Sequence, residues 1–467
     1  MDNHEVANPS VAAVILAAGL GKRMQSTLPK VLHPLAGRPL VGHVLAAVQP
    51  LGVQPLLVVG HQAAQVQAYA EQAFPGSQFA LQAAQQGTGH AVMQAAPLLQ
   101  GRLELAQVIV LAGDVPLIST VTLTALLETH RQSGAKLTVL TAQAPDPYGY
   151  GRIVRDVAGN VAAIVEEKEA DAAQRAISEV NSGVFAYEAA WLWAHLPLLS
   201  PSPRTGEYYL TDLLAMAVAE GGAHALPLGL PGYYETQGIN DRIQLAEAEG
   251  RVQETLRRRL MLAGVSMPDP ASVYLHIGVE VGRDSTILPN SYLEGSTVVG
   301  EGCEIGPGSH LLNASLGDRV RVTASYVEDS RLDDEVEMGP FCHVRGNSHL
   351  SNHVRLGNFA EVNRSTIGDH SAMGHFSYLG DATLGQHVNV GAGAITANYD
   401  GKRKNRTLIG DNVFIGSDTI LRAPLTVGAG ASTGAGAVVT RDVPAGMIAV
   451  GVPARMLPKK AEPPSVE

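Results

Sequence analysis

The chain has 467 residues, a length that suggests two or three domains, and 45% of them are hydrophobic, which allows a sizeable core. A net charge of −11 argues against a general nucleic-acid-binding protein, and only two cysteines, Cys303 and Cys342, argue against a disulfide framework. We expect a soluble cytoplasmic protein that contacts no membrane. Asp2 and Glu5 stand where a signal peptide carries basic residues, and no apolar run is long enough to span a bilayer.

From residue 11 to about 240, apolar segments alternate with amphipathic ones. We expect strands at 11–16, 56–59 and 108–111, and helices at 39–51, 63–72 and 122–132. This alternation predicts an α/β, Rossmann-like domain with a mostly parallel sheet and helices on both faces. A polar stretch at 241–262 predicts a connecting helix. The predicted organisation is therefore a first domain at 1–240, a linker helix at 241–263 and a second domain at 264–467.

The second domain has a six-residue period. Sixteen aliphatic or methionine residues and one threonine recur in step: Leu332, Met338, Val344, Leu350, Leu356, Val362, Ile367, Met373, Leu379, Leu384, Val390, Ile409, Ile415, Leu421, Val427, Thr433 and Val439. A run this long argues against chance spacing, and a hexapeptide repeat predicts a parallel β-helix whose aliphatic residues point inward. Glycine often follows them, as in Leu356-Gly357. We expect these glycines at tight corners, which would explain the 50 glycines of the chain.

A glycine-containing segment, L-A-A-G-L-G-K-R-M at 16–24, directly follows the first predicted strand. Its small residues would let backbone N–H groups approach a phosphate, although the segment is neither G-x-G-x-x-G nor a Walker A motif, and a plain turn is equally possible. With Pro29-Lys30 downstream, it resembles the sugar-nucleotide pyrophosphorylases. The resemblance implies that Leu16, Ala17, Ala18 and Gly19 hold a nucleoside triphosphate, and that Arg23 and Lys30 neutralise its phosphates.

Further segments match the same family in order. Gln82, Gly87 and Thr88 resemble its uracil-reading element, and Gly151, Glu166 and Asn181 resemble its sugar contacts. Asp114 ends a predicted strand, and together with Asn240 it resembles the family's Mg²⁺ ligands; Mg²⁺ prefers such oxygen ligands. Each of these polar residues could alone be a turn or capping residue. Because six segments match in the correct order, a turn or capping role does not explain the whole set.

The β-helix period is interrupted at 396–407, where Lys402, Arg403, Lys404 and Arg406 suit an anionic ligand or a solvated loop. The surrounding N-V-G-A-G-A-I-T-A-N-Y-D-G resembles the bifunctional N-acetylglucosamine-1-phosphate uridylyltransferases/glucosamine-1-phosphate N-acetyltransferases, and the resemblance extends from residue 11 to about 450. It implies a left-handed β-helix, a homotrimer and a role in peptidoglycan synthesis. It also implies acetylation of glucosamine-1-phosphate by acetyl-CoA, followed by UMP transfer from UTP to give UDP-N-acetylglucosamine and pyrophosphate.

The resemblance also implies the residues of acetyl transfer. His375 matches the catalytic base, and a base is needed because the attacking amine must be neutral. One of 16 histidines would otherwise be assigned a structural role. The implied acceptor contacts are Arg345, Tyr378 and Asn389, and the implied coenzyme contacts are Ala392, Asn398, Tyr399, Lys404, Ser417 and Ala435.

Two positions depart from the family pattern. Asn363, followed by Arg364, replaces a usual lysine, and Gly451, with Arg455 nearby, replaces a cation that contacts coenzyme A. Two alternatives therefore stay open. The β-helix could be a trimerisation module of a single-function nucleotidyltransferase, or the acceptor could be another amino sugar. His349 and His353 are four residues apart, a spacing that does not align metal ligands on a β-helix.

Overall fold

The computed structural model describes residues 11–102 and 104–458. By packing, the chain divides into two units, Met1–Gly250 and Arg251–Glu467, each with its own interior. The division falls inside the helix that we predicted as a linker. The functional domain limits at 240 and 264 remain a prediction.

The first unit contains a nine-stranded sheet with the order β11-β7-β10-β6-β1-β4-β5, to which β8 and β9 attach at β10. The neighbours of β1 are parallel to it, whereas β10 runs antiparallel to both β6 and β7. The strands are β1 (Val11–Ala17), β4 (Pro55–Val59), β5 (Gln78–Leu81), β6 (Gln107–Ala112), β7 (Leu137–Gln143), β8 (Arg152–Arg155), β9 (Val161–Val165), β10 (Glu179–Glu188) and β11 (Ala223–Leu228), with a separate pair β2 (Pro34–Leu35) and β3 (Arg38–Pro39).

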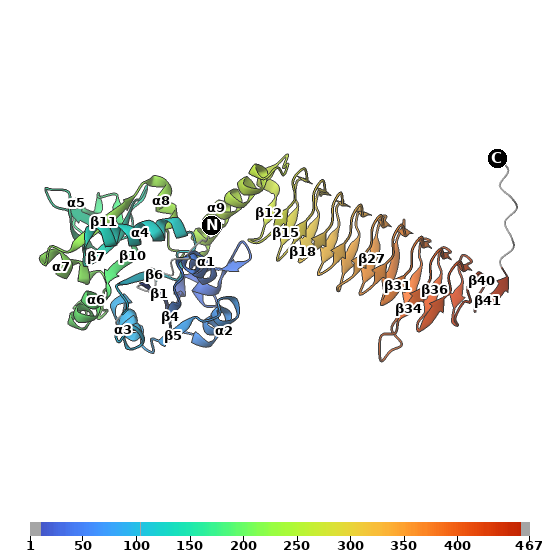
Figure 1. Ribbon diagram of the computed structural model, residues 1–467, viewed down its shortest axis with the longest axis horizontal. Helices are drawn as coiled ribbons and strands as arrows, with labels where there is room; N and C mark the ends of the chain where they lie inside the picture. The colour runs from blue at the N-terminus through green and yellow to red at the C-terminus, as the bar shows by residue number, and fades with distance from the viewer. Residues whose placement is uncertain (1–10, 103, 459–467) are drawn as a thin grey trace, which may run out of the picture. The chain divides into compact units, whose positions relative to one another are not determined.

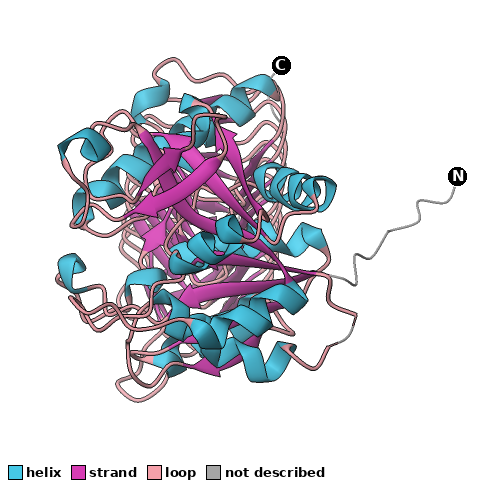
Figure 2. Cartoon of the chain, turned by 90° about the vertical axis from the view of Figure 1, so that its left-hand side faces the viewer, coloured by secondary structure: helices cyan, strands magenta, loops and turns pink. Residues whose placement is uncertain are grey.

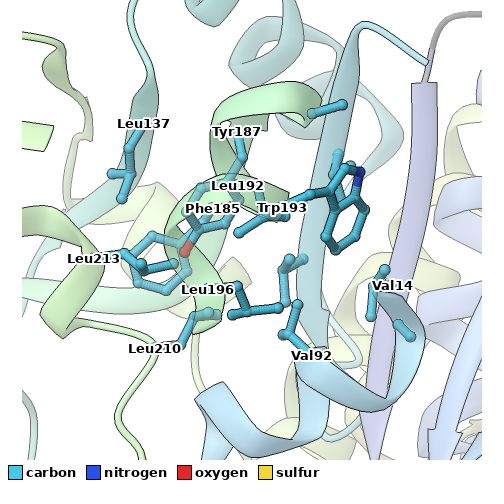
Figure 3. Packing of buried hydrophobic residues seen from close by; sticks show 14 of the residues in the cluster. Val14, Val92, Leu137, Phe185, Tyr187, Leu192, Trp193, Leu196, Leu210 and Leu213 are labelled. Carbon is cyan, nitrogen blue, oxygen red and sulfur yellow. The ribbon is translucent and has the colours of Figure 1, made fainter. Parts of the chain in front are cut away.

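Helices cover both faces of this sheet (Figure 2). The helices of this unit are α1 (Leu40–Val48), α2 (Ala63–Ala73), α3 (Thr88–Leu99), α4 (Thr120–Ser133), α5 (Ala172–Arg175), α6 (Ala189–His195), α7 (Asp212–Ala219) and α8 (Leu230–Glu235). A further helix, α9 (Arg242–Leu262), crosses the division between the two units. Alternate residues of β1 enter two apolar layers, as the two-residue period of a strand requires. Val14 packs with α3, α6 and α7 (Figure 3), and Ile15 packs with α1, α2 and α4.

The predicted strands and helices of this unit are all present, with small differences at their ends. The predicted helix 39–51 stops at Val48, and a 3-10 turn follows in which Pro50 cannot continue the α-helical hydrogen bonds. Of the nine strands of the sheet, only β1, β4 and β6 were predicted individually, and β10 is a strand whose sequence argues against one. Its Asn-Ser-Gly sequence is typical of a turn, but here it forms a bulge between Asn181 and Phe185, with Gly183 at φ 76°.

The second unit is a left-handed parallel β-helix of hexapeptide repeats, drawn as a stack of coils in Figure 1. Each coil contributes one strand to each of three sheets. The β12 sheet contains β12 (Tyr274–Leu275), β15 (Tyr292–Glu294), β18 (His310–Leu312), β21 (Tyr326–Glu328), β24 (His343–Arg345), β27 (Ala360–Asn363), β30 (Ser377–Gly380), β33 (Ile395–Ala397), β36 (Ile420–Arg422) and β39 (Val438–Val439). These ten strands correspond to the ten coils expected from the repeat.

The other two sheets follow the same order. The β13 sheet contains β13 (Glu280–Val281), β16 (Val298–Val299), β19 (Ser315–Leu316), β22 (Arg331–Leu332), β25 (His349–Leu350), β28 (Thr366–Ile367), β31 (Ala382–Leu384), β34 (Thr407–Ile409) and β37 (Leu425–Val427). The β14 sheet contains β14 (Thr286–Ile287), β17 (Glu304–Ile305), β20 (Arg321–Val322), β23 (Glu337–Met338), β26 (Arg355–Leu356), β29 (Ala372–Met373), β32 (Asn389–Val390), β35 (Phe414–Ile415), β38 (Ser432–Thr433), β40 (Met447–Val450) and β41 (Arg455–Pro458).

All seventeen residues of the predicted six-residue series are buried. The glycines that follow them are needed for space between coils. A Cβ on Gly357 would overlap the carbonyl oxygen of Gly374 in the next coil, and one on Gly416 would lie 2.6 Å from the carbonyl oxygen of Thr433. Left-handed backbone occurs elsewhere at the corners, and many of these residues are not glycine, for example His353, His370 and His387.

Candidate active sites

A pocket in the first unit collects eight of the predicted nucleotide residues. Leu16 lies near the end of β1 and three others follow this strand, while the rest lie after β5, at the start of α3 and after β6, so the pocket opens where parallel strands end. Its lining residues are Leu16, Ala18, Gly19, Lys30, Val31, Gln82, Gln85, Gly87, Thr88, Ala91, Ala112, Asp114, Glu207 and Tyr209.

Two glycines let the chain close tightly around this pocket. Gly21 has φ 57°, and a Cβ there would lie 2.6 Å from the Cβ of Lys30. Gly87 has φ 97°, and its Cβ would lie 2.5 Å from the carbonyl oxygen of Tyr208. Neither position accepts another residue without a shift of the backbone, because both the conformation and the space require glycine.

Lys30, Asp114 and Asn240 meet at one edge of the pocket. The Nζ of Lys30 forms an ion pair with Asp114 and donates to Oδ1 of Asn240 at 3.1 Å. Two hydrogen bonds from backbone N–H groups fix the segment that carries Asn240. Ile239 N–H donates to the Asp114 carbonyl at 2.9 Å, and Asn240 N–H donates to Oε1 of Gln244 at 2.7 Å. Two hard oxygen atoms therefore converge on one positive group.

This pair of oxygens fits a divalent cation of the Mg²⁺ type, which takes few protein ligands and keeps water and phosphate oxygens for the rest. Within the described residues, no three His, Cys, Asp or Glu side chains form a cluster suited to a metal.

The three predicted sugar contacts lie close together. Asn181 N–H donates to the Gly151 carbonyl at 2.8 Å, and a Cβ on Gly151 would lie 3.5 Å from the Glu166 carboxylate. Burial raises the pKa of Glu166, and Thr211 donates to it at 3.4 Å. Burial also raises the pKa of Tyr150, to which the charge of Asp114 contributes. Tyr150, next to Gly151, is therefore within electrostatic reach of Asp114.

Two predicted residues lie apart from these groups in the described chain. Ala17 is buried in β1, and Arg23 is exposed in the turn Lys22–Met24; neither lines the pocket. Arg152, next to Gly151, donates to Glu167 at 2.6 Å and has a structural role.

Sequence reasoning missed the contribution of residues 207–210 to this pocket. Gly89 N–H donates to the Tyr208 carbonyl at 2.8 Å, and Leu210 N–H donates to Oγ1 of Thr88 at 3.0 Å. Glu207 and Tyr209 reach the pocket through these bonds, although no motif marks them. Gln85 had a weaker signal, because it stands between Gln82 and Gly87.

In the β-helix, four predicted residues from four different coils form a single column at the corner between the β14 and β12 sheets. Backbone hydrogen bonds at and beside these residues join successive coils: Gly393 N–H donates to Phe376 O at 2.7 Å, Asp418 N–H to Ala392 O at 2.7 Å, and Gly436 N–H to Ser417 O at 2.8 Å. We call this the His375 column; its members are His375, Ala392, Ser417 and Ala435. His375 is exposed. Asn389 is exposed on the adjoining β14 sheet.

The other two predicted acceptor residues, Arg345 and Tyr378, lie on the β12 sheet. Arg345 binds Oε1 of Glu361 through two nitrogens, at 2.6 and 3.2 Å, and Glu361 pairs in register with Tyr378. Asn363 is buried, and its Oδ1 accepts from Arg364 at 3.1 Å. Arg364 in turn donates to both carboxylate oxygens of Asp381. The guanidinium that follows Asn363 is thus already paired.

The interruption of the period is an ordered loop that projects from the coils (Figure 1). Tyr399 and Lys404 form a backbone bridge, and Asn405 N–H donates to the Asn398 carbonyl at 2.7 Å. The carboxylate of Asp400 accepts from Arg403 N–H, from Nδ2 of Asn405 and from Lys402 N–H, each at 2.9 Å, and these bonds lower its pKa to about 2. The loop therefore presents its aromatic and basic side chains from a fixed turn.

The remaining predicted positions are also placed. His349 binds Oδ2 of Asp333 at 2.7 Å, whereas His353 binds Oε2 of Glu335 at 3.1 Å, so each histidine has its own carboxylate partner. Arg455 pairs with Val450 across β40 and β41, directly beside Gly451. An arginine therefore stands next to the position where the family's cation is missing.

Comparisons with known proteins agree for both units. A model of the MobA-like NTP transferase domain matches residues 13–182, and a model of the bacterial transferase hexapeptide matches residues 278–313 and 406–441. Proteins named "Bifunctional protein GlmU" are similar along the chain. The one from Heliobacterium modesticaldum is 50% identical over 94% of both chains, and the one from Pelobacter propionicus is 48% identical over 94% of this chain and 95% of its own. The Geobacillus thermodenitrificans protein is also 48% identical over the same shares. Among the described helices, none has the length and apolar character of a membrane span.

Proposed function

Because the chain belongs to the family of bifunctional GlmU proteins, we infer that it makes UDP-N-acetylglucosamine in two steps. It is a bifunctional enzyme: an N-acetyltransferase that acetylates glucosamine-1-phosphate with acetyl-CoA, and a nucleotidyltransferase that joins the product to UMP from UTP. The product is a precursor for peptidoglycan synthesis. This conclusion rests on sequence identity of 48–50% to proteins of this family over 94% of the chain, a match that covers both units.

We propose that the pocket of the first unit binds UTP. Gln82 is buried at the pocket, and its amide nitrogen is held by the Gly87 carbonyl at 3.0 Å, which leaves the amide oxygen to accept from an N–H of uracil. The segment Leu16–Gly19 at the end of β1 and Lys30 would contact the phosphates, and Gly151, Glu166 and Asn181 would hold the sugar. Glu207 and Tyr209 are additional lining residues from the distant segment.

Uridylyl transfer needs no covalent intermediate on the protein. An oxygen of the sugar phosphate attacks the α-phosphorus of UTP, a P–O bond forms and pyrophosphate leaves. Lys30 neutralises triphosphate charge from the place where it now meets Asp114 and Asn240, and Arg23 would approach from its exposed turn. Asp114 and Asn240 would hold Mg²⁺, which when bound supplies further neutralisation of the triphosphate.

We propose that acetyl transfer takes place beside the His375 column. The acceptor nitrogen attacks the thioester carbon of acetyl-CoA, a C–N bond forms, the C–S bond breaks and coenzyme A leaves as its thiol. His375 takes the proton from the attacking amine, a task suited to imidazole near neutral pH. Arg345, which now binds Glu361, would release this carboxylate and bind the acceptor phosphate instead. Tyr378 and Asn389 would be further acceptor contacts.

The coenzyme would lie along the column and the loop. Ala392, Ser417 and Ala435 provide successive backbone steps one coil apart, and the loop adds Asn398, Tyr399 and Lys404. Coenzyme A carries several phosphates, so the basic loop and Arg455 at the end of the coil stack offer complementary charge.

We further propose a homotrimer in which the outer face of the β12 sheet is covered by other copies. Tyr274, Tyr292 and Tyr326 are 40–50% exposed on this face, and the first two rings stack at 5.0 Å. The β14 sheet instead carries Glu304, Arg321, Glu337 and Arg355 at its outer positions. A row of exposed aromatic rings favours a protein partner. A monomeric mass from light scattering of the full chain would contradict the trimer.

We also propose that the enzyme acts in the cytoplasm, where UTP and acetyl-CoA are available. Both cysteines are buried free thiols, which suits a reducing compartment.

The decisive assay uses purified protein with acetyl-CoA and glucosamine-1-phosphate, and then with UTP and N-acetylglucosamine-1-phosphate. We expect product in both reactions. Activity in the second reaction alone would favour a β-helix that serves only for trimerisation. Faster acetylation of galactosamine-1-phosphate than of glucosamine-1-phosphate would favour the alternative acceptor.

A further inference from the structure

Asp381 occupies the corner between β30 and β31 and joins two parts of the acetyl-transfer region. Its Oδ1 accepts from Nε of Arg364 at 2.8 Å, and its Oδ2 accepts from the second guanidinium nitrogen at 3.0 Å and from Nδ2 of Asn398 at 2.5 Å. Asp381 N–H donates to the Asn363 carbonyl at 3.0 Å, and Thr407 N–H donates to the Asp381 carbonyl at 3.1 Å. Asp381 therefore connects the preceding coil to both ends of the projecting loop.

The groups that Asp381 holds lie against Tyr378. A Cβ on the neighbouring Gly380 would overlap the Tyr378 hydroxyl and would lie 2.6 Å from Nδ2 of Asn398. The side chains of Tyr378 and Asn398 thus both lie next to the backbone of Gly380. The hydrogen bond from Arg364 is the main cause of the lowered pKa of Asp381, and the charge of Lys404 adds to it, so this loop cation is also within electrostatic reach.

We propose that Asp381 is a positioning residue for acetyl transfer, an inference that rests on the function proposed above. By binding Asn398 and Arg364 together, its carboxylate fixes the root of the basic loop against the coil that carries Tyr378. It also occupies the guanidinium of Arg364, so that this cation is withheld from the acceptor phosphate.

The chemistry of the corner requires a carboxylate rather than an amide. Three donor nitrogens from Arg364 and Asn398 converge on the two oxygens of Asp381. Asparagine offers one oxygen and one NH₂ group, so one donor would face another donor. Asp381 has φ 51°, and both Asp and Asn tolerate the left-handed region better than other side chains do. Asp381→Asn therefore changes hydrogen bonding and charge while leaving the backbone preference in place.

The chain offers a matched control on the same corner, three coils earlier. Asp329 has φ 45°, its N–H donates to the Leu312 carbonyl at 2.9 Å, and its carboxylate accepts from Nδ2 of Asn313 at 2.9 Å. The backbone setting is the same, and the carboxylate again accepts from an asparagine amide, which here comes from the preceding coil, whereas Asn398 comes from the following one. Among the described residues, none that we propose for acetyl transfer contacts Asp329. Asp329→Asn measures the effect of the substitution on the coil itself.

The test uses full-length wild type, Asp381→Asn and Asp329→Asn, with kcat and KM determined for both reactions. For Asp381→Asn we expect acetyl transfer to lose about 10–100-fold in kcat/KM, because small misplacements of binding groups have effects of this size, with the larger part in KM for acetyl-CoA. Uridylyl transfer should stay unchanged. Asp329→Asn should remain within about twofold of wild type in both reactions.

Limited trypsin digestion gives a readout that does not depend on activity. Lys402, Arg403, Lys404 and Arg406 are cleavage sites within the loop, and mass spectrometry identifies cuts there. If Asp381 anchors the loop, cleavage in Asp381→Asn is several times faster than in wild type, whereas cleavage in Asp329→Asn is unchanged. Arg364→Ala, which removes one partner of the same carboxylate, should also speed cleavage.

The inference is overturned if Asp381→Asn keeps acetyl transfer within twofold of wild type, or if both aspartate variants lose it equally. It is also overturned if trypsin cuts the loop of Asp381→Asn no faster than that of wild type. A wild-type chain that transfers no acetyl group would instead refute the proposed function, and the digestion would still decide whether Asp381 holds the loop.

Discussion

The two units assemble their candidate sites in different ways. In the first unit, a pocket draws its lining from segments as distant as Leu16 and Tyr209, which meet because parallel strands end at one edge. In the β-helix, His375, Ala392, Ser417 and Ala435 stand in a column in which each coil contributes one residue. The first site is concave and built by convergence. The second lies along an exposed corner and is built by repetition.

This difference determines which residues each site depends on. A convergent pocket depends on single residues that hold distant segments, such as Thr88, whose hydroxyl accepts from Leu210 N–H. A repeated column depends on coil register, which the buried aliphatic series already secures, and on the groups that attach additional chain to it. The two chemistries should therefore separate cleanly by mutation.

The largest expected effect is that of Asp114→Ala. The substitution removes the anion that meets Lys30 and one of two oxygens proposed to bind the metal. Loss of one electrostatic group at a reacting phosphate commonly lowers rates by about 10²–10³-fold. Uridylyl transfer should fall by at least that factor while acetyl transfer stays near normal. Parallel loss of acetyl transfer in a folded variant would contradict the separation of the sites.

His375→Ala is the reciprocal test in the column. A general base typically contributes about 10²–10⁴-fold, and acetyl transfer should fall within that range. Uridylyl transfer in the same preparation serves as the control for folding and should be unaffected. Unchanged acetyl transfer would show that His375 is not the base.

A third prediction concerns the acid stability of the first unit. Burial lowers the pKa of His130 to about 4, whereas a histidine in an unfolded chain titrates near 6.5. Between these pH values the unfolded state binds more protons. The contribution of His130 is complete above pH 6.5 and is lost as the pH falls towards 4, a total of roughly 3 kcal/mol.

Urea unfolding followed by tryptophan fluorescence measures this effect in the first unit alone, because Trp191 and Trp193 are the two tryptophans of the chain and both lie in α6. In His130→Leu, the dependence between pH 6.5 and 4 should become shallower. An equally steep dependence would assign the acid sensitivity to other groups.

The variant Asn363→Lys tests whether the proposed acceptor site lacks a cation. Since Arg364 is held by Asp381, it does not replace the usual lysine, and an added charge beside Arg345 should lower KM for glucosamine-1-phosphate severalfold. Asn363 is buried, so thermal unfolding must be compared with wild type. A KM that rises severalfold in a stable variant would mean that the added charge crowds the acceptor phosphate.

The smallest expected effect is in the core of the first unit. The hydroxyl of Tyr187 is buried and has no hydrogen-bond partner within the described part of the chain, and its ring lies among Phe185, Leu192 and Leu213 (Figure 3). Tyr187→Phe removes an unsatisfied polar atom, so the free energy of unfolding should rise by about 0.5–1 kcal/mol. A decrease of that size in the same fluorescence experiment would indicate a bound water.

The sequence predicted the β-helix more completely than the α/β unit, for a physical reason. A repeat contains the same register signal many times, so the inward-pointing residues could be identified from the sequence, and all of them are buried. In the first unit, β10 escaped prediction because its bulge has the composition of a turn, and Glu207 and Tyr209 reach the pocket only through tertiary contacts. The pairing of Arg364 with Asp381 was equally hidden, since the two residues meet only when one coil stacks on the next.

The projecting loop also bears on how such a chain changes over generations. Strand β34 pairs Thr407 with Ala382, 25 positions earlier, whereas β31 pairs Thr383 with Thr366, only 17 positions earlier, yet the aliphatic residues remain in phase. An insertion between Ala397 and Thr407 therefore leaves the interior undisturbed, and each doubling of a flexible loop's length opposes folding by only about 0.6 kcal/mol. Insertions and deletions at this one point are nearly neutral for folding, so the ligand preference of the loop is free to diverge while the coils stay fixed.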